Sequence, residues 1–340
     1  MADTLLQPDE LRPHTDRANA ILSELDRILL GRTDLHRMVV IGILARGHIL
    51  LEGVPGLGKT ALAKGLGDVL SLELKRVQFT PDLMPGDILG TNILQEGERG
   101  QRVFQFQAGP IFTNVLLADE INRASPKTQS ALLEAMQERA VTMFGTTRPL
   151  PEPFFVMASQ NPIEFEGTYP LPEAQIDRFL FKLHVGGLDA DVLEEIISTR
   201  RRGEPPAPRA RVTREELGEL FAAVDAIFLP RAVSRYIARL VSSTHPESGL
   251  ETVVKYVSLG ASPRAAIAIA EAARAEALLS GRPTVGFDDV KRVAHAVLNH
   301  RMILGYRARL DGIRPQQIID NVLGAISETE LRLPRDVEVA

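Results

Sequence analysis

The stretch "GVPGLGKT", residues 53–60, decides the fold, because the spacing G-x-x-x-x-G-K-T is typical of a loop that holds phosphate groups. The apolar run "HILLE", residues 48–52, has the length of a buried strand, and "KTALAKGLGDVL", residues 59–70, has the 3.6-residue repeat of a helix. Between a strand and a helix, the backbone N–H groups of this loop converge on an anion, and the positive end of the helix dipole points to the same place. The sequence therefore predicts a site for a nucleoside triphosphate, without choosing between a kinase, a GTPase and a motor.

Each residue type in this loop has a physical reason. Glycines let the backbone approach a phosphate without a Cβ clash, Pro55 stiffens the turn, and Lys59 offsets charge on the β- and γ-phosphates. The predicted nucleotide-binding residues of the loop and the first helical turn are Gly53, Val54, Pro55, Gly56, Leu57, Gly58, Lys59, Thr60 and Ala61.

Length and composition indicate a globular protein of about two domains. The chain has 340 residues, of which 44% are hydrophobic and 24% are charged. Its net charge of −5 argues against a general nucleic-acid surface, and the absence of cysteine excludes disulfides and thiolate metal sites. The histidines show no spacing typical of metal ligands, so we predict no transition-metal site and expect His295 and His300 to pack or to face solvent.

No segment of the sequence is expected to cross a membrane. The longest apolar stretch, "MVVIGILARGHILLEG", is interrupted by Arg46, Gly47 and His48. The first residues, "MADTLLQPDELRPHTDR", lack the basic and apolar regions of a signal peptide. We therefore expect a cytoplasmic protein.

Five short apolar runs predict the strands of an α/β fold. They are "HILLE" (48–52), "LKRVQF" (74–79), "NVLLAD" (114–119), "PFFVMAS" (153–159) and "FLFKLHV" (179–185). Helical patterns separate most of these runs, which favours a parallel five-stranded sheet covered by helices on both faces. Two further helices, joined at Gly31, are expected between residues 16 and 46.

Two segments do not fit this alternation and predict β-hairpins. "TNILQEGERGQRVFQFQAGPIF", residues 91–112, turns around residues 96–100, and "RAVTMFGTTRPLPE", residues 139–152, turns near Gly145. From the pattern alone, such hairpins either face a partner or are simply solvated.

The Pro-rich and Arg-rich stretch "GEPPAPRARV", residues 203–212, predicts a domain boundary. We expect a nucleotide-binding domain over residues 1–204 and a second domain over residues 205–340. The arginines of the stretch are typical of a solvated connector.

The second domain is predicted to be a small all-helical bundle. Thr213 and Glu216 form the capping-box pattern that begins one helix. Ser262 and Pro263 suit the N-cap and first position of an Ala-rich helix that continues to about Ser280.

Acidic residues at the end of an apolar strand predict the second half of a hydrolytic site. In "NVLLADE", Asp119 and Glu120 end the third apolar run. The Thr60 hydroxyl and Asp119 are the predicted Mg²⁺ ligands, directly or through water, and Glu120 is placed to polarise a water for attack on the γ-phosphate.

Three more residues are candidates for the site. Asn161 follows the fourth apolar run and would orient the attacking water. Arg178, in "PEAQIDRF", is either a local ion-pair partner or an arginine that reaches the nucleotide of a neighbouring subunit. Arg264 lies at a helix N-terminus, where the dipole disfavours a cation, so an anion such as phosphate would stabilise it, and from there the helical domain would sense the nucleotide.

Taken together, these motifs resemble the MoxR family of AAA+ ATPases. The resemblance is carried by "GVPGLGKT", "VQFTPDLMPGDILG", "FQAGPIFTNVLLADEINRASPKTQSALLEAMQE", "SQNPIEFEGTYPLPEAQIDRFLF" and "GASPRA". It extends from about residue 16 to 330, and residues 109–181 carry its most specific part. The sequence departs from the usual pattern mainly at Ser159, where threonine is common.

The resemblance implies an AAA+ αβα P-loop NTPase core with β-hairpin insertions and a C-terminal helical lid, with the nucleotide bound between core and lid. It identifies residues 53–60 as the Walker A loop, Asp119 and Glu120 as the Walker B pair, Asn161 as sensor 1, Arg178 as the arginine finger and Arg264 as sensor 2. Arg123, in "EINRAS", is a second candidate for the subunit interface.

The resemblance also implies a function: Mg²⁺-dependent ATP hydrolysis by a hexameric ring that remodels a client protein, often together with a partner that carries a von Willebrand factor A domain. The main alternative is a nucleic-acid motor, against which the acidic net charge and the mixed-charge hairpins count. A metabolite kinase or GTPase is a second alternative, but no N-K-x-D motif is present. A third is a module that binds ATP without hydrolysis, against which Glu120 and Asn161 argue.

Overall fold

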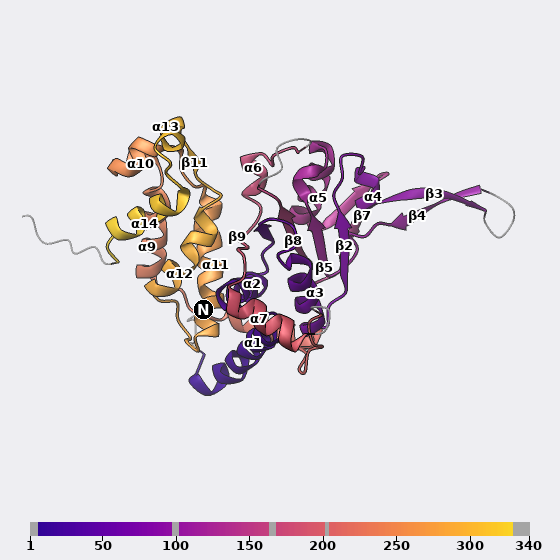
Figure 1. The fold of residues 1–340 in the computed structure, drawn as a ribbon, viewed down its shortest axis with the longest axis horizontal. Coiled ribbons are helices and arrows are strands. Elements are labelled where there is room, and N and C mark those ends of the chain that lie inside the picture. Colours follow the sequence, from indigo (N-terminus) through magenta and orange to yellow (C-terminus); the bar gives the residue numbers. More distant parts are fainter. Residues whose placement is uncertain (1–5, 97–101, 163–167, 201–203, 329–340) are drawn as a thin grey trace, which may run out of the picture.

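The computed structural model describes residues 6–96, 102–162, 168–200 and 204–328. Figure 1 shows a layered α/β part, a helical part beside it and a long hairpin that extends on the side away from the helical part. The α/β fold with a helical lid, predicted from the sequence, is confirmed.

Five parallel strands form the central sheet, in the order β2-β5-β8-β1-β9. They are β1 (Ile49–Glu52), β2 (Leu74–Gln78), β5 (Val115–Asp119), β8 (Phe155–Gln160) and β9 (Phe181–His184). Each coincides with one of the five predicted apolar runs. The inner strands are buried along nearly their whole length, because helices cover both faces of the sheet, and their polar residues lie at the carboxyl ends.

Helices cover the two faces with different residues of the same strands. On one face, alternate side chains such as Leu51 and Leu117 pack against α1 (Pro8–Ile28), α2 (Thr33–Leu44) and α3 (Lys59–Val69). On the other face, Leu50 and Leu116 pack against α4 (Pro85–Leu89) and α5 (Pro126–Glu138). The remaining short elements here are η1 (Ile121–Arg123), α6 (Glu173–Ile176) and α7 (Ala190–Thr199).

The first helix begins earlier than the sequence pattern predicted. It starts at Pro8 rather than near residue 16, because Pro8 occupies the first turn and the Glu10 carboxylate accepts a hydrogen bond from the Gln7 N–H at 3.0 Å. These end signals lie outside the apolar repeat from which the helix was predicted.

Both predicted hairpins are present. β3 (Gly90–Glu96) pairs antiparallel with β4 (Arg102–Ala108). Of the predicted turn at residues 96–100, all but Glu96 lies outside the described residues. β6 (Ala140–Met143) pairs with β7 (Thr146–Pro149) through a turn in which Gly145 has a φ of 74°.

The helical part contains α8 (Arg214–Asp225), α9 (Arg231–Ser242), η3 (Pro246–Ser248), α10 (Glu251–Tyr256), α11 (Pro263–Leu279), α12 (Phe287–Leu298), α13 (Tyr306–Leu310) and α14 (Pro315–Ala325). It also contains a small antiparallel pair, β10 (Val257–Leu259) with β11 (Ile303–Leu304). The prediction of an all-helical bundle missed this pair, because two or three residues are too few for a periodic pattern. The division of the chain after residue 204 stays a prediction.

The two predicted helix starts of this part had different outcomes. The capping box that begins α8 is confirmed: the Thr213 N–H donates to Glu216 at 2.8 Å, and the Glu216 N–H donates to the Thr213 hydroxyl at 3.2 Å. Helix α11 does begin after Ser262, but the Ser262 hydroxyl does not cap it and donates instead to Asp177 at 3.0 Å. A tertiary contact has replaced the local one.

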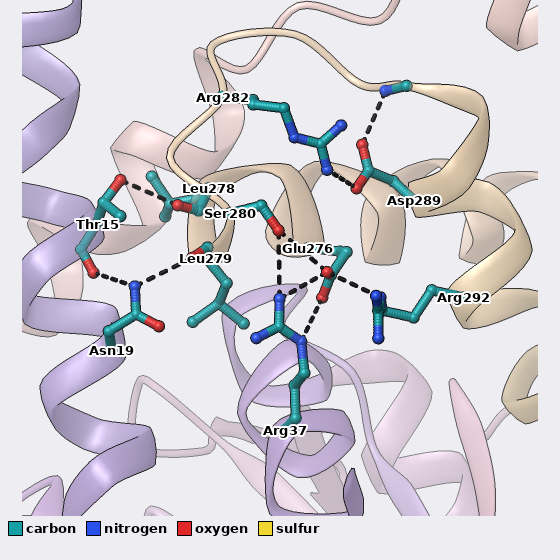
Figure 2. Close-up of polar contacts among 11 residues, drawn as sticks. Thr15, Asn19, Arg37, Glu276, Leu278, Leu279, Ser280, Arg282, Asp289 and Arg292 are labelled. Carbon is teal, nitrogen blue, oxygen red and sulfur yellow. Dashed lines mark hydrogen bonds and ion pairs between the residues drawn. The ribbon is translucent and has the colours of Figure 1, made fainter.

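The lid is fastened to the N-terminal helices at the end of α11 (Figure 2). Thr15 and Asn19 of α1 donate to the backbone carbonyls of Leu278 and Leu279, each at 3.0 Å. The guanidinium of Arg37, on α2, donates to both carboxylate oxygens of Glu276, at 2.6 and 3.0 Å.

Glu276 is the buried centre of this contact. It is 1% exposed, and Arg292 of α12 also reaches it at 3.1 Å. One apolar core runs from α1 and α2 into the lid. In the described ranges, no helix has the length and apolar character needed to span a bilayer.

We expect Arg37→Met to lower the free energy of unfolding by about 2 to 3 kcal/mol, because it leaves a buried carboxylate with less compensating charge. The control is Arg274→Met in the same lid. Arg274 is about as exposed as Arg37 (25% and 24%), but its partner Glu271 is 38% exposed rather than 1%. The control should cost less than about 1 kcal/mol. Urea unfolding of both variants measures this, and equal losses would contradict the assigned role of the buried pair.

Candidate nucleotide site

The phosphate loop, the two acidic residues and Asn161 follow the ends of three neighbouring strands. The loop follows β1, Asp119 ends β5 and Asn161 follows β8, which lies between them in the sheet. The Gly53 N–H donates to the Gln160 carbonyl at 3.2 Å and so joins the loop to β8. The carboxyl ends of parallel strands lie at one edge of the sheet, where open α/β folds bind ligands. The structure therefore brings these predicted site residues together.

The loop itself has the conformation that its glycines were expected to allow. Gly56 and Gly58 have φ values of 84° and 78°, in the left-handed region that other residues rarely adopt, and α3 begins directly after them at Lys59. Thr60 and Ala61 follow in the first turn of α3, with Thr60 exposed.

Lys59 holds its positive charge inside the loop. Its Nζ donates to the carbonyls of Gly53 and Val54, the latter at 3.2 Å. Burial lowers the pKa of the Lys59 amine, and the nearby carboxylates of Asp119 and Glu120 oppose that shift. A partly desolvated cation bound only to neutral carbonyls is well suited to receive a phosphate oxygen.

Asp119 is buried and has partners on both sides. The Ser159 hydroxyl of β8 donates to one carboxylate oxygen. Arg76 of β2 donates to the other from Nη2 at 2.7 Å and from Nε at 3.2 Å. Ser159, noted in the sequence only as a departure from the usual threonine, thus holds the acid in place across the sheet.

Glu120 has a backbone conformation that turns the chain sharply after β5. Its φ is 57° and its N–H donates to the Ser159 hydroxyl at 2.9 Å. Its carboxylate accepts hydrogen bonds from Gln78 at 2.8 Å and from Arg123 at 3.0 Å, both at Oε2. A non-glycine residue in the left-handed region is uncommon and is often found at functional sites.

Sequence reasoning missed Arg76 and Gln78. Both lie on β2 two positions apart, so their side chains share one face, and β2 pairs with β5 so that Gln78 lies opposite Asp119. The polar residues within the run "LKRVQF" were the available signal. Their role required knowing that β2 is the neighbour of β5.

Asn161 and Arg123 lie near these acids, but only Arg123 bonds to one of them. Asn161 is buried, and its backbone carbonyl accepts a hydrogen bond from the Asn122 side chain at 3.4 Å. Arg123, considered as a candidate for the subunit interface, bonds to Glu120 of its own chain.

A pocket of about 410 Å³ opens beside the loop. Leu57, Ala61 and Leu62 form one side of it, and apolar residues of α7 and of the α1–α2 junction form the other. Arg32 closes it by donating to the Leu57 carbonyl and, at 2.8 Å, to that of Gly186. A largely apolar pocket next to a phosphate site suits the base of a nucleotide.

Arg178 and Arg264 lie elsewhere. Arg178 precedes β9, so it is at the amino edge of the sheet, opposite the edge that carries the loop. Its Nη1 donates to the Leu133 carbonyl of α5 at 2.7 Å. Arg264 is exposed, and its guanidinium lies 3.6 Å from the carboxylate of Asp177.

Both arginines line one pocket of about 390 Å³, together with Arg46 and Arg139, and no residue of the loop lines it. Within one chain, therefore, the structure does not bring Arg178 or Arg264 to the phosphate loop. In particular, the start of α11 does not cover the pocket beside the loop, where Arg264 was expected to sense the nucleotide of its own chain.

Comparisons with known proteins identify the family. Residues 48–181 match the ATPase family associated with various cellular activities (AAA), and residues 251–322 match the AAA lid domain. Chaperone MoxR1 of Mycobacterium tuberculosis is 45% identical over 89% of this chain and 80% of its own length. Protein MoxR of Methylorubrum extorquens is 30% identical over 92% of this chain and 94% of its own length.

A solved structure is also similar. It is that of a putative ATPase from Cytophaga hutchinsonii, with a TM-score of 0.86 and 40% identity over 94% of this chain and 97% of that one. The fold, the lid and the identity with relatives along most of the chain lead to one conclusion: this chain belongs to the MoxR family of AAA+ ATPases.

Proposed function

We propose that this ATPase binds Mg²⁺ and ATP at the loop 53–60, hydrolyses ATP at a site that a second copy completes, and uses the cycle to remodel a client protein. The observation that carries the proposal is the separation of two sets of residues. The loop, Asp119, Glu120 and Asn161 lie at one edge of the sheet, and Arg178 and Arg264 lie at the other. In a ring of identical subunits, the contacts are head-to-tail, so one surface of a copy meets a different surface of the next copy. The edge that carries the loop in one copy can then face the edge that carries Arg178 and Arg264 in its neighbour.

The residues at the loop suit Mg²⁺. This ion prefers oxygen ligands and is held by one or two protein groups together with phosphate oxygens and water. The Thr60 hydroxyl and the Asp119 carboxylate are such groups, and we propose that they hold it. When bound, Mg²⁺ offsets the charge of the phosphates.

Hydrolysis requires a base, and Glu120 is the proposed one. Both of its hydrogen bonds reach Oε2, and in the described part of the chain Oε1 accepts none. Oε1 is therefore the proposed acceptor for the proton of the attacking water, while the Asn161 amide orients that water. Lys59 binds the β- and γ-phosphates.

Arg178 and Arg264 of the adjacent copy supply the remaining positive charge. Their shared pocket at the amino edge of the sheet has room for another molecule's phosphates. An arginine supplied from a neighbouring protein stabilises the transition state of phosphoryl transfer. A hexameric ring is the assembly proposed by family resemblance.

The proposed client is a protein rather than a nucleic acid. The β3–β4 hairpin exposes apolar side chains, with Phe104 74% exposed and Leu94 beside it in the register. A surface of this kind fits an apolar partner better than a phosphate backbone. A similar chain is named Chaperone MoxR1, and we extend that activity to this one, with a protein that carries a von Willebrand factor A domain as a proposed partner.

We expect Lys59→Ala to weaken ATP binding at least about 100-fold, since the variant loses the buried cation that faces the phosphates. Fluorescence anisotropy of a labelled ATP analogue measures the affinity. Lys64→Ala is the matched control, because Lys64 lies on the same helix but is exposed, and it should bind normally. Unchanged binding by the Lys59 variant would refute the assignment of the loop.

Glu120→Gln should bind ATP as the wild type does and assemble normally, but its kcat should fall about 100-fold or more, because glutamine cannot accept the proton. Phosphate release under saturating ATP gives kcat, and size-exclusion chromatography checks assembly. A kcat near that of the wild type would rule out Glu120 as the base.

Mixing Arg178→Ala with Lys59→Ala subunits should restore activity that neither variant has alone. In an equal mixture, up to about a quarter of the interfaces combine an intact loop with an intact arginine. Phosphate release across mixing ratios tests this, with labelled subunits to verify co-assembly. Co-assembled rings that stay inactive at every ratio would argue against a shared site.

A further inference from the structure

The segment that carries Arg178 is held by three consecutive side chains of the lid, residues 299–301, which follow α12. Arg301, the last of the three, makes most of the contacts, and its side chain is 3% exposed. Its guanidinium donates five hydrogen bonds. The acceptors are the Asp177 carboxylate (2.8 Å) and the backbone carbonyls of Asp177 (3.2 Å), Phe179 (2.6 Å), Leu180 (3.0 Å) and Val297 (2.6 Å).

The two residues before Arg301 extend the same contact. Asn299 donates to the Lys182 carbonyl at 2.9 Å. His300 Nε2 donates to the Phe179 carbonyl at 3.0 Å. Burial keeps the pKa of this imidazole well below its usual range. Backbone carbonyls on both sides of Arg178 are therefore fixed by the lid.

Asp177 links this contact to the second arginine. Besides Arg301, its carboxylate accepts a hydrogen bond from the Ser262 hydroxyl at 3.0 Å and lies 3.6 Å from Arg264, at the start of α11. Asp177 precedes Arg178 directly in the chain. The buried Arg301–Asp177 ion pair is therefore next to Arg264 in space and next to Arg178 in the chain.

The arrangement is specific to arginine at position 301. A planar guanidinium with five N–H groups can satisfy several carbonyls and a carboxylate at once, whereas an amine has three donors on a flexible stem. The buried charge of Arg301 is compensated by Asp177, which is the condition for its stability in the interior. Arg301 also lines the amino-edge pocket, but its five N–H groups are occupied within the chain and leave none for a phosphate.

We propose that Arg301 is a positioning residue: through Asp177 and the backbone around Arg178, it holds Arg178 and Arg264 as one unit against the ATP of the adjacent copy. The lid of one subunit then sets the rate of hydrolysis on the next. This inference rests on the shared site proposed above.

The test is a set of subunit mixtures with Arg301→Gln, in which kcat, the KM for ATP and assembly are measured. Alone, Arg301→Gln should assemble and bind ATP as the wild type does, with kcat at least about 10-fold lower, because small misplacements of catalytic groups are costly. Arg282→Gln is the matched control: Arg282 pairs with Asp289, a lid carboxylate that is 1% exposed, and in the described part of the chain its hydrogen bonds lie within the lid. It should leave kcat unchanged.

The mixtures distinguish positioning from a merely structural role. In a mixture of Arg301→Gln and Lys59→Ala subunits, the first variant provides an intact loop and the second a correctly placed Arg178, so activity should be restored. In a mixture of Arg301→Gln and Arg178→Ala subunits, neither variant provides a correctly placed Arg178, so activity should stay low. If Arg301 instead served the site of its own chain, the pattern would be reversed.

An unchanged kcat for Arg301→Gln would overturn the inference, and so would restored activity when Arg301→Gln is mixed with Arg178→Ala. A third contrary outcome is that Lys59→Ala restores activity to Arg178→Ala but not to Arg301→Gln. If the mixture of Arg178→Ala and Lys59→Ala is inactive although it co-assembles, the shared site fails and the inference fails with it. If Arg301→Gln does not fold, Asp177→Asn decides by the same pattern, because it keeps the shape of the side chain and removes the ion pair.

Discussion

The parallel pairing of β5, β8 and β1 is the constraint on which the rest of the structure depends. Because the three strands run in the same direction and in register, everything that follows them in the chain emerges at one edge of the sheet. The phosphate loop, Asp119 with Glu120, and Asn161 are such continuations. The same rule sends the segment before β9 to the opposite edge, and Arg178 with it. A single chain therefore gathers the groups that we propose to hold the nucleotide and keeps Arg178, the proposed arginine finger, away from them.

Polar contacts between strands then fix the orientation of the acids. Ser159 bonds to the carboxylate of Asp119 and to the N–H of Glu120, so β8 fixes both residues at the end of β5. Arg76 and Gln78 approach the same two acids from β2. The proposed catalytic edge is thus built across neighbouring strands, so a substitution on β2 or β8 would change the contacts of Asp119 and Glu120.

The lid is bonded to the core at two places. The end of α11 is fastened to α1 and α2 through Glu276, and residues 299–301 are fastened to the segment around Arg178. Both contacts bury charged groups with their partners, so movement of the lid relative to either one is costly.

Local patterns predicted much of this molecule. The five strands, both hairpins, the phosphate loop and the capping box at Thr213 depend on residues close together in the chain, and all were predicted. What was missed depends on contacts between distant segments. Ser262 looks like a cap but bonds to Asp177, and Arg76 looks like a surface residue but faces Asp119. The placement of Arg264 beside Asp177 depends on how the lid packs, which no local pattern contains.

An electron cryo-microscopy structure of the Glu120→Gln protein with Mg²⁺ and ATP would show where both arginines lie relative to the bound nucleotide. We expect the guanidinium of Arg178 within hydrogen-bond distance of a γ-phosphate bound to the loop 53–60 of the adjacent subunit, with Arg264 of the same subunit as Arg178 beside it. If Arg178 and Arg264 lay beside the nucleotide of their own subunit, or away from every nucleotide in the assembly, the shared site would be refuted.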